Sequence, residues 1–471
     1  MIPARTFSGQ NVAVFGMGLS GLTVAFALRE GGAAVSAWDD GEAGRRAASD
    51  AGFAVKDLRA ADWRRFGALV LSPGVPLTHP EPHWTVNLAR ASGVEIIGDT
   101  EIFCRERRAS SAQTTMIAIT GTNGKSTTTA LTHHLLRAAG VHAEIGGNIG
   151  RAVLDMPPFA DGLHYVLEFS SFQIDLTPSL DPDVAALLNI TPDHLDRHGT
   201  LENYARVKSR VFDALSPAGA AVIGMDDALC KGIARDVAVR GHRVTKVSAT
   251  RPLSDGVFHR DGMLFEVESG RISSTANLSA IGTLRGAHNG QNAATAIAIA
   301  RSLGIEWNVL AEGLTSFPGL PHRLEEVGRL GRVLFINDSK ATNADAAARA
   351  LESFPDIYWI AGGRAKAGGL AGLEHLYHRV RHAYLIGEAA PDFARSLSGL
   401  VPFTQAGTLD AAVERAAHDA LRDEASAEPV VLLSPACASY DQFPNFAARG
   451  DAFRAAVSSL SGVTLRRAEA A

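Results

Sequence analysis

Residues 116–127 read Met-Ile-Ala-Ile-Thr-Gly-Thr-Asn-Gly-Lys-Ser-Thr, an apolar run followed by a glycine-containing turn and the start of a helix-like segment. Glycines at 121 and 124 let the backbone N–H groups turn inward, and the following helix directs its positive end at an anion. Lys125 adds a positive charge, and the Ser126 hydroxyl suits Mg²⁺. The stretch therefore predicts a strand, a phosphate loop and a helix that bind a nucleoside triphosphate through Gly121, Thr122, Asn123, Gly124, Lys125, Ser126 and Thr127.

This loop is a shortened variant of the strict phosphate-loop pattern. The strict pattern has a glycine five residues before Gly124, where this chain has Ile119. The alternative is an ordinary strand-to-helix turn with a lysine at the start of the helix. A buried strand followed by Gly-Lys-Ser-Thr favours the nucleotide site over that alternative.

Length and composition indicate a multidomain enzyme. The 471 residues are too many for one core and suggest about three domains. Apolar residues make up 46% and charged residues 20%, and the net charge of −5 gives no basic field for nucleic acid or anionic lipid. The N-terminus has neither a signal-peptide pattern nor a membrane-span pattern. The three cysteines, Cys104, Cys230 and Cys437, lack metal-type spacing, so a reducing, cytoplasmic location is expected.

A second glycine-rich turn opens the chain. The apolar segment 11–15 precedes Gly16-Met17-Gly18-Leu19-Ser20-Gly21, and Asp39 follows a second apolar segment about twenty residues later. This βαβ pattern with G-x-G-x-x-G is typical of a Rossmann-like domain. Taken alone it proposes a nicotinamide cofactor, but the same glycines serve the diphosphate of a nucleotide sugar equally well. A turn selected only for helix–strand packing is the remaining alternative.

Three α/β regions are expected along the chain. The first ends near residue 112, because the polar segment 105–115 resembles a linker, and the second runs over 113–318 with a mainly parallel sheet. Short alternating segments over 251–285 are expected to form a small β-rich insertion. The Pro/Gly-rich segment 317–321 is typical of a hinge. The third region, 319–471, again alternates apolar strands with polar loops and is expected to be Rossmann-like.

Groups suited to divalent cations follow the phosphate loop. Glu168 ends an apolar strand, at the sheet edge where α/β sites assemble, and His194 comes just after another strand. A carboxylate and an imidazole near phosphates could complete Mg²⁺ shells, although a lone histidine is more often a loop residue that caps backbone. Lys208 would ordinarily be a solvated helix lysine, and its spacing does not distinguish it.

The chain resembles the Mur ligase family of ATP-dependent amide ligases of peptidoglycan synthesis, over essentially its whole length. Several motifs in the same order carry the resemblance. They are the loop 121–127, Gly-Asn-Ile-Gly at 147–150, Glu-Phe-Ser-Ser-Phe-Gln at 168–173, His-Asn-Gly-Gln-Asn at 288–292, Gly-Leu-Pro-His-Arg at 319–323, Asn-Asp-Ser-Lys-Ala-Thr-Asn at 337–343 and Ser-Pro-Ala-Cys-Ala-Ser-Tyr-Asp-Gln-Phe at 434–443. One such match could arise by chance, whereas the ordered set could not.

The resemblance implies a UDP-substrate domain over 1–112, an ATP-binding domain over 113–318 and an amino-acid domain over 319–471. It implies that ATP and two Mg²⁺ ions are used, with Lys125, Lys208 and His194 as catalytic residues. Lys208 matches the carbamylated lysine of the family, which converts an ammonium into a carboxylate-like metal ligand. The metal ligands implied are Ser126, Glu168, His194 and Lys208, and the further ATP contacts are Asn292, Arg323 and Asp338.

The resemblance also implies the substrates, UDP-N-acetylmuramoyl-L-alanine and D-glutamate. The UDP substrate is expected to contact Gly18, Leu19, Ser20, Asp39, Ser72, Gly74, Asn148 and His194. D-Glutamate brings two carboxylates, which require several donors or cations, and the matching positions are Lys340, Thr342, Lys366, Ser439 and Phe446. Arg364 stands where the family more often has an acidic or small residue, so it could shift or share the role of Lys366.

Other classes of protein explain less of the chain. A sister ligase for another amino acid, or a folylpolyglutamate synthase, shares the central ATPase, but the glycine fingerprint at 16–21 and the motif at 434–443 argue against both. The chain also lacks the Asp-Asn-Pro-Arg motif of diaminopimelate-adding relatives. An NAD-dependent dehydrogenase leaves residues 121–127 unexplained. A non-catalytic nucleotide-binding regulator gives no reason for Glu168, His194 and Lys208 together. We expect a monomeric enzyme without a nucleic-acid or membrane partner.

Overall fold

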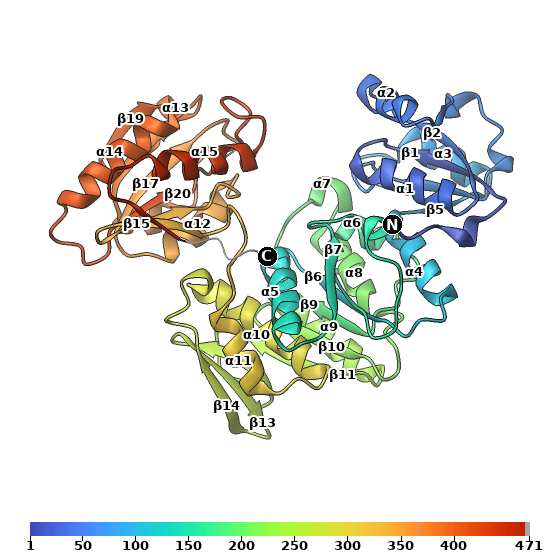
Figure 1. The fold of residues 1–471 in the computed structure, drawn as a ribbon, viewed down its shortest axis with the longest axis horizontal. Helices are drawn as coiled ribbons and strands as arrows, with labels where there is room; N and C mark the ends of the chain where they lie inside the picture. The colour runs from blue at the N-terminus through green and yellow to red at the C-terminus, as the bar shows by residue number, and fades with distance from the viewer. Residues whose placement is uncertain (367, 467–471) are drawn as a thin grey trace. The chain divides into compact units, whose positions relative to one another are not determined.

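The computed structural model describes residues 1–366 and 368–466. These residues form three β-sheets that are covered by α-helices. Their contacts divide the chain into two compact units (Figure 1). The first unit comprises Met1–Asn277 and Asn289–Thr315, and the second comprises Leu278–His288 and the chain from Ser316 onward. The predicted α/β fold class is confirmed. No helix in the described part of the chain is long and apolar enough to cross a membrane.

The N-terminal sheet is parallel, with strand order β3-β2-β1-β4-β5. The apolar side chains of β1 and β4 are buried on both faces, between helices that cover the sheet. Gly21 allows the first helix to approach the first turn closely, because a Cβ there would lie 1.8 Å from the Gly16 carbonyl oxygen. The elements are β1 (Asn11–Phe15), α1 (Leu19–Glu30), β2 (Ala34–Trp38), α2 (Glu42–Asp50), β3 (Ala54–Val55), β4 (Ala68–Leu71), α3 (Trp84–Ala91), β5 (Glu95–Ile97) and α4 (Asp99–Ala109).

The predicted linker over 105–115 is wrong in its first half. Helix α4 continues to Ala109. Charged side chains in its last turns form hydrogen bonds with other parts of the protein. Glu106 is buried and accepts hydrogen bonds from the backbone N–H and the hydroxyl of Thr6, at 2.7 and 2.6 Å. Arg107 donates to the Asp181 carbonyl at 3.0 Å. The segment is polar like a linker, but it is helical, and its charged side chains have hydrogen-bond partners in the fold.

The central sheet has the strand order β14-β13-β12-β11-β10-β9-β6-β8-β7. Strand β6 pairs in parallel with both β8 and β9, so the carboxyl ends of these three strands meet at one edge. The elements are β6 (Thr115–Thr120), α5 (Lys125–Ala138), β7 (Ala143–Gly147), β8 (His164–Glu168), α6 (Ser171–Asp175), β9 (Val184–Leu187), α7 (Leu195–His198), α8 (Leu201–Ser209), β10 (Ala220–Gly224), α9 (Ala228–Val239), β11 (Arg243–Ser248), β12 (Gly256–Arg260), β13 (Met263–Glu268), β14 (Arg271–Asn277), α10 (Ala287–Ser302) and α11 (Trp307–Thr315).

The β-rich character predicted for residues 251–285 is present, but these strands are not a separate insertion. Strand β12 pairs in parallel with β11, and β13 and β14 follow in antiparallel order. They extend the central sheet at one edge.

The C-terminal sheet has the order β19-β18-β17-β20-β16-β15-β21, with an antiparallel edge at β15 and β21. Helices α14 and α15 bury their apolar residues on one face, and α12 and α13 do so on the other (Figure 1). The elements are β15 (Glu325–Leu330), β16 (Val333–Asn337), α12 (Ala344–Glu352), β17 (Ile357–Gly362), β18 (Val380–Ile386), α13 (Ala390–Leu397), β19 (Phe403–Gly407), α14 (Leu409–Arg422), β20 (Val430–Leu433), α15 (Phe446–Ser458) and β21 (Thr464–Leu465).

Substitution of Trp359 tests how much this core contributes to stability. Its side chain is fully buried in β17, and its Nε1–H donates to the Ser434 carbonyl at 2.7 Å. We expect Trp359→Ala to lower the free energy of unfolding by about 3–5 kcal/mol, through the cavity and the lost hydrogen bond. Urea unfolding followed by circular dichroism measures this change. Leu400→Ala, at a side chain that is 62% exposed, is the control, and an equal loss in both variants would contradict this account of the core.

Candidate functional site

The predicted phosphate loop lies at the carboxyl end of β6, and α5 begins at Lys125. Gly124 has φ +85°, and a Cβ there would lie 2.2 Å from Oδ1 of Asn292. Only glycine fits this position without displacing Asn292. The Thr128 hydroxyl donates to the same Oδ1 at 3.2 Å. The structure therefore places Asn292, on α10, against the loop.

Asn189 and Gln291 hold the loop in shape. Asn189 accepts from the backbone N–H of Asn123 at 2.9 Å through its Oδ1, and its Nδ2 donates to Gln291 Oε1 at 2.8 Å. The Gln291 amide donates in turn to Asp226 at 3.1 Å. Sequence reasoning gave these two residues no role. The available signal was local polarity, since Asn189 directly follows the apolar strand β9 and Gln291 lies in the polar run His-Asn-Gly-Gln-Asn of α10.

Two lysines converge on the Gly121 carbonyl oxygen. Lys125 Nζ donates to it at 3.1 Å and to the Thr122 carbonyl at 2.8 Å, and Lys208 Nζ donates to it at 2.8 Å. Ser126 follows Lys125 in the first turn of α5. The positive end of the helix and the Lys125 ammonium thus lie where the phosphates of a nucleotide are expected.

Lys208 is buried, so the expectation of a solvated helix lysine is wrong. Its side chain is 1% exposed, and its Nζ lies 4.7 Å from the ring centroid of Tyr204. Burial, together with the neighbouring charge of Lys125, lowers the pKa of Lys208 well below its usual value. An amine with a lowered pKa is neutral for a larger part of the time, and the neutral amine is the nucleophilic form.

Glu168 ends β8 beside the loop and is 1% exposed. Its Oε1 accepts from Asn148 Nδ2 at 2.7 Å, whereas its Oε2 is buried and has no hydrogen-bond partner. An unpartnered buried carboxylate oxygen is suited to a cation. Within the described residues no group of three or more His, Cys, Asp and Glu could hold a metal ion. An Mg²⁺ ion held by Glu168 would therefore need further oxygen ligands, such as a side-chain hydroxyl or the phosphates of a nucleotide.

His194 has φ +52° and precedes α7. Its side chain is about half exposed, 3.4 Å from Asp193, and its ring lies 4.9 Å from that of Phe172. Arg197, on the same short helix, donates to the carbonyls of Gly74 and Val75 at 2.8 Å each. Within the first unit this ties α7 to the loop after β4, which carries the predicted residues Ser72 and Gly74.

The first glycine turn is held by Asp39. Its Oδ2 accepts from the Met17 N–H, and its Oδ1 accepts from the Gly41 N–H, both at 2.7 Å. The predicted contacts Gly18, Leu19 and Ser20 follow this turn. A Cβ at Gly18 would meet nothing within 4 Å, and Leu19 is 81% exposed. The turn therefore leaves open space beside its backbone.

Four of the predicted residues of the second unit follow two parallel strands, with Asp338, Lys340 and Thr342 after β16 and Ser439 after β20. Asp338 is buried, which raises its pKa to about 7, and it accepts from the Ser434 hydroxyl at 2.8 Å. Lys340 Nζ lies 3.9 Å from the ring centroid of Phe446. Arg323, Thr342 and Ser439 belong to the same unit. Lys366 is exposed, and Arg364 forms an ion pair with Glu388 at 3.0 Å.

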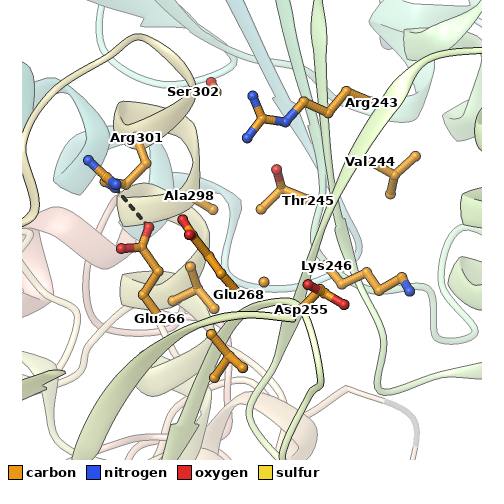
Figure 2. Close-up of a pocket in the computed structure, with 13 residues that line it drawn as sticks. Arg243, Val244, Thr245, Lys246, Asp255, Glu266, Glu268, Ala298, Arg301 and Ser302 are labelled. Atoms are coloured by element: carbon orange, nitrogen blue, oxygen red, sulfur yellow. Dashed lines mark hydrogen bonds and ion pairs between the residues drawn. The ribbon is translucent and has the colours of Figure 1, made fainter. Parts of the chain in front are cut away.

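A cavity of about 260 Å³ lies elsewhere in the first unit, between β11, β12, β13 and α10 (Figure 2). Arg301 and Glu266 form an ion pair of 2.8 Å on its wall. None of the predicted site residues lines it. The cavity is thus separate from the phosphate loop.

The chain is similar to known proteins in sequence and in fold. The chain matches the Mur ligase middle domain over residues 119–300 and the Mur ligase glutamate ligase domain over 322–437. Among solved structures, UDP-N-acetylmuramate-alanine ligase MurC of Thermotoga maritima has a TM-score of 0.57 at 17% identity, covering 96% of this chain and 99% of its own. The MurF ligase of the same organism, in complex with ADP, has a TM-score of 0.56 at 18% identity, covering 96% and 95%.

The chain belongs to the Mur ligase family. Curated relatives of nearly the same length are much more similar than the solved structures. One from Mesorhizobium japonicum is 55% identical over 98% of each chain, and one from Brucella suis is 55% identical over the full length of both. Both relatives are named UDP-N-acetylmuramoylalanine–D-glutamate ligase.

His198, beside this site, should make folding sensitive to acid. Its ring stacks on Phe172 and lies 2.9 Å from the Ser171 hydroxyl, and burial lowers its pKa to about 4. The unfolded chain has the higher pKa, so this histidine stabilises the fold fully above about pH 6.5 and loses that effect as the pH falls toward 4.

We expect His198→Gln to weaken the fall in stability between pH 7.5 and pH 5, because glutamine does not titrate. Urea unfolding at the two pH values measures it, and the exposed His375→Gln is the control. An unchanged pH dependence in the His198 variant would show that this ring is not held neutral by the fold.

Proposed function

We propose that this protein joins D-glutamate to UDP-N-acetylmuramoyl-L-alanine with cleavage of ATP, a step in the synthesis of peptidoglycan precursors. The observation that carries the ligase chemistry is the convergence of Lys125, Lys208 and Glu168 beside Gly121 at one sheet edge. The choice of substrates is supported by the full-length relatives that carry this activity in their names. A sister ligase for another amino acid is the alternative.

The reaction requires activation, because a carboxylate is a poor electrophile. Transfer of the γ-phosphate of ATP to the carboxylate of the UDP substrate forms an acyl phosphate with a good leaving group. The amine nitrogen of D-glutamate then attacks the acyl carbon, the C–O bond to phosphate breaks, and the amine loses a proton as phosphate departs. Lys125 and the N-terminus of α5 stabilise the negative charge that gathers during phosphoryl transfer.

We propose that Ser126, Glu168, His194 and Lys208 hold two Mg²⁺ ions. When bound, the metal supplies further neutralisation of phosphate charge. Support comes from the unpartnered Oε2 of Glu168 and from the lowered pKa of Lys208. The neutral amine can add CO₂ by forming an N–C bond and releasing a proton, which leaves a carbamate anion. This would turn a buried lysine into an oxygen ligand.

The remaining site assignments also stand as proposals. We assign residues 1–112 to the UDP substrate, 113–318 to ATP and 319–471 to the amino acid. The open turn at Gly18, together with Ser72, Gly74, Asn148 and His194, would hold the UDP substrate. Asn292, Arg323 and Asp338 would contact ATP, and Lys340, Thr342, Lys366, Ser439 and Phe446 would contact D-glutamate. The protein would act as a cytoplasmic monomer, in which its three unpaired, buried cysteines stay reduced.

Amino-acid selectivity tests the function. With ATP and UDP-N-acetylmuramoyl-L-alanine, D-glutamate should drive phosphate release, whereas L-glutamate, D-alanine and meso-diaminopimelate should not. The reason is that the proposed site must match two carboxylates and one stereochemistry. Phosphate release measures it. Preference for meso-diaminopimelate or L-glutamate would leave the ligase class standing and refute the assignment of D-glutamate.

Lys208→Ala tests the proposed carbamate. The variant should lose most activity, and added acetate or formate should restore part of it by supplying a carboxylate to the metal. Lys231→Ala, on α9, is the matched control and should keep its activity in the same phosphate-release assay. Full activity in Lys208→Ala would exclude the carbamate role.

A further inference from the structure

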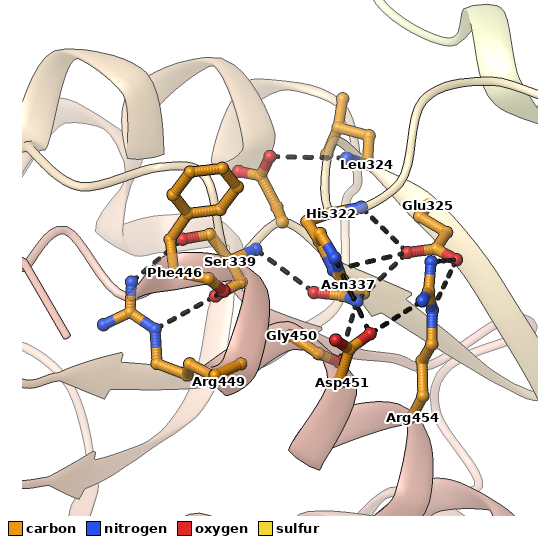
Figure 3. A network of polar contacts seen from close by, with 12 residues as sticks. His322, Leu324, Glu325, Asn337, Ser339, Phe446, Arg449, Gly450, Asp451 and Arg454 are labelled. Carbon is orange, nitrogen blue, oxygen red and sulfur yellow. Dashed lines mark hydrogen bonds and ion pairs between the residues drawn. The ribbon is translucent and has the colours of Figure 1, made fainter. Parts of the chain in front are cut away.

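A buried arginine joins the segments of the second unit that carry the proposed amino-acid site. Arg449 lies one turn into α15, which begins at Phe446, and it is 1% exposed. Figure 3 shows its guanidinium directed at Ser339, in the loop that follows β16. The sequence interpretation gave Arg449 no role.

Its hydrogen bonds connect two loops. Nε donates to the Ser339 hydroxyl at 3.0 Å, and Nη2 donates to the Ser339 carbonyl at 2.9 Å. The same Nη2 donates to the Cys437 carbonyl, in the loop after β20, at 3.0 Å. The Ser339 hydroxyl in turn donates to the Phe446 carbonyl at 2.8 Å, which ties the start of α15 to the first loop (Figure 3).

These loops carry the proposed contacts for D-glutamate. Lys340 is the next residue after Ser339, and Ser439 lies two residues after Cys437. Strands β16 and β20 are parallel neighbours, so both loops leave the same edge of the sheet. The hydrogen bonds of Arg449 to Ser339 and Cys437 therefore constrain the position of Lys340 relative to Ser439.

The charge of Arg449 is not neutralised by an ion pair within the described part of the chain. None of the described carboxylates forms an ion pair with it, and its Nη1 is buried without a hydrogen-bond partner. A Cβ on Gly363 would lie 3.2 Å from this Nη1, so the glycine leaves room for the guanidinium. Burial lowers the pKa of Arg449 to about 10. A desolvated cation with an unused donor costs free energy, and no ion pair among the described residues offsets that cost.

We propose that Arg449 is a positioning residue for the amino-acid substrate, which it does not touch. By holding Ser339 and Cys437 on one guanidinium, it fixes the distance between Lys340 and Ser439, and hence the spacing at which two carboxylates are received. This inference rests on the proposed D-glutamate ligase function.

The test separates positioning from general stability. In Arg449→Met, the KM for D-glutamate should rise about tenfold or more, which corresponds to about 1.4 kcal/mol. The KM values for ATP and for UDP-N-acetylmuramoyl-L-alanine should stay within about twofold. In Arg449→Ala, millimolar guanidinium chloride should lower the KM for D-glutamate again, because the free ion can occupy the emptied space. The unaltered protein should not respond to it.

Arg332→Met is the matched control. Arg332 also donates to two backbone carbonyls, those of Ser426 at 2.5 Å and Asp423 at 2.6 Å, but it precedes β16 and so lies at the opposite end of that strand. The variant Arg332→Met should lower the melting temperature without changing the KM for D-glutamate. If Arg449→Met does not fold, Ser339→Ala removes the hydroxyl that Arg449 and Phe446 share, and it should raise the same KM.

The outcomes are distinguishable. An unchanged KM for D-glutamate in a folded Arg449 variant, or a parallel rise in all three KM values, overturns the positioning role. Absence of guanidinium rescue in folded Arg449→Ala also overturns it. If the unaltered protein releases no phosphate with D-glutamate, the proposed function itself fails.

Discussion

The hydrogen bonding at the carboxyl end of β6 is the interaction on which the arrangement of the proposed ATP site depends. The Gly121 carbonyl oxygen there receives hydrogen bonds from both Lys125 and Lys208. Burial and the nearby charge of Lys125 lower the pKa of Lys208, which favours the neutral amine beside the second lysine. Since β8 is the parallel neighbour of β6, Glu168 arrives at the same edge. Two amines and one carboxylate are thus brought together although Lys125, Glu168 and Lys208 are far apart in sequence.

In the second unit, polar loops at a sheet edge are held together by hydrogen bonds from buried side chains. Its parallel strands β16 and β20 also deliver polar loops to one edge, but loops without regular structure need cross-links to keep their spacing. Arg449 supplies such a cross-link through backbone carbonyls, and Asp338 supplies another through Ser434. Buried polar groups that are held in this way order their surroundings at some cost in stability.

Much of the fold followed from the sequence because its signals are local. Apolar runs of four to six residues that alternate with helical segments predict parallel sheets, and β1, β10, β16 and β20 lie where those runs placed them. The polar segment 105–115 misled because Glu106 and Arg107 have partners far away in the sequence. For the same reason, the strands over 251–285 could not be assigned to the edge of the central sheet before β11 was seen to pair with β12.

The sequence by itself determined the phosphate loop, the glycine turn of the first sheet and the α/β class, since glycine spacing and hydrophobic period act over neighbouring residues. Tertiary structure alone decided the state of Lys208, the unpartnered oxygen of Glu168, the support of the loop by Asn189 and Gln291, and the bridge made by Arg449. Burial and pairing between distant segments produce these properties, because they depend on which groups exclude water from one another after the chain has folded.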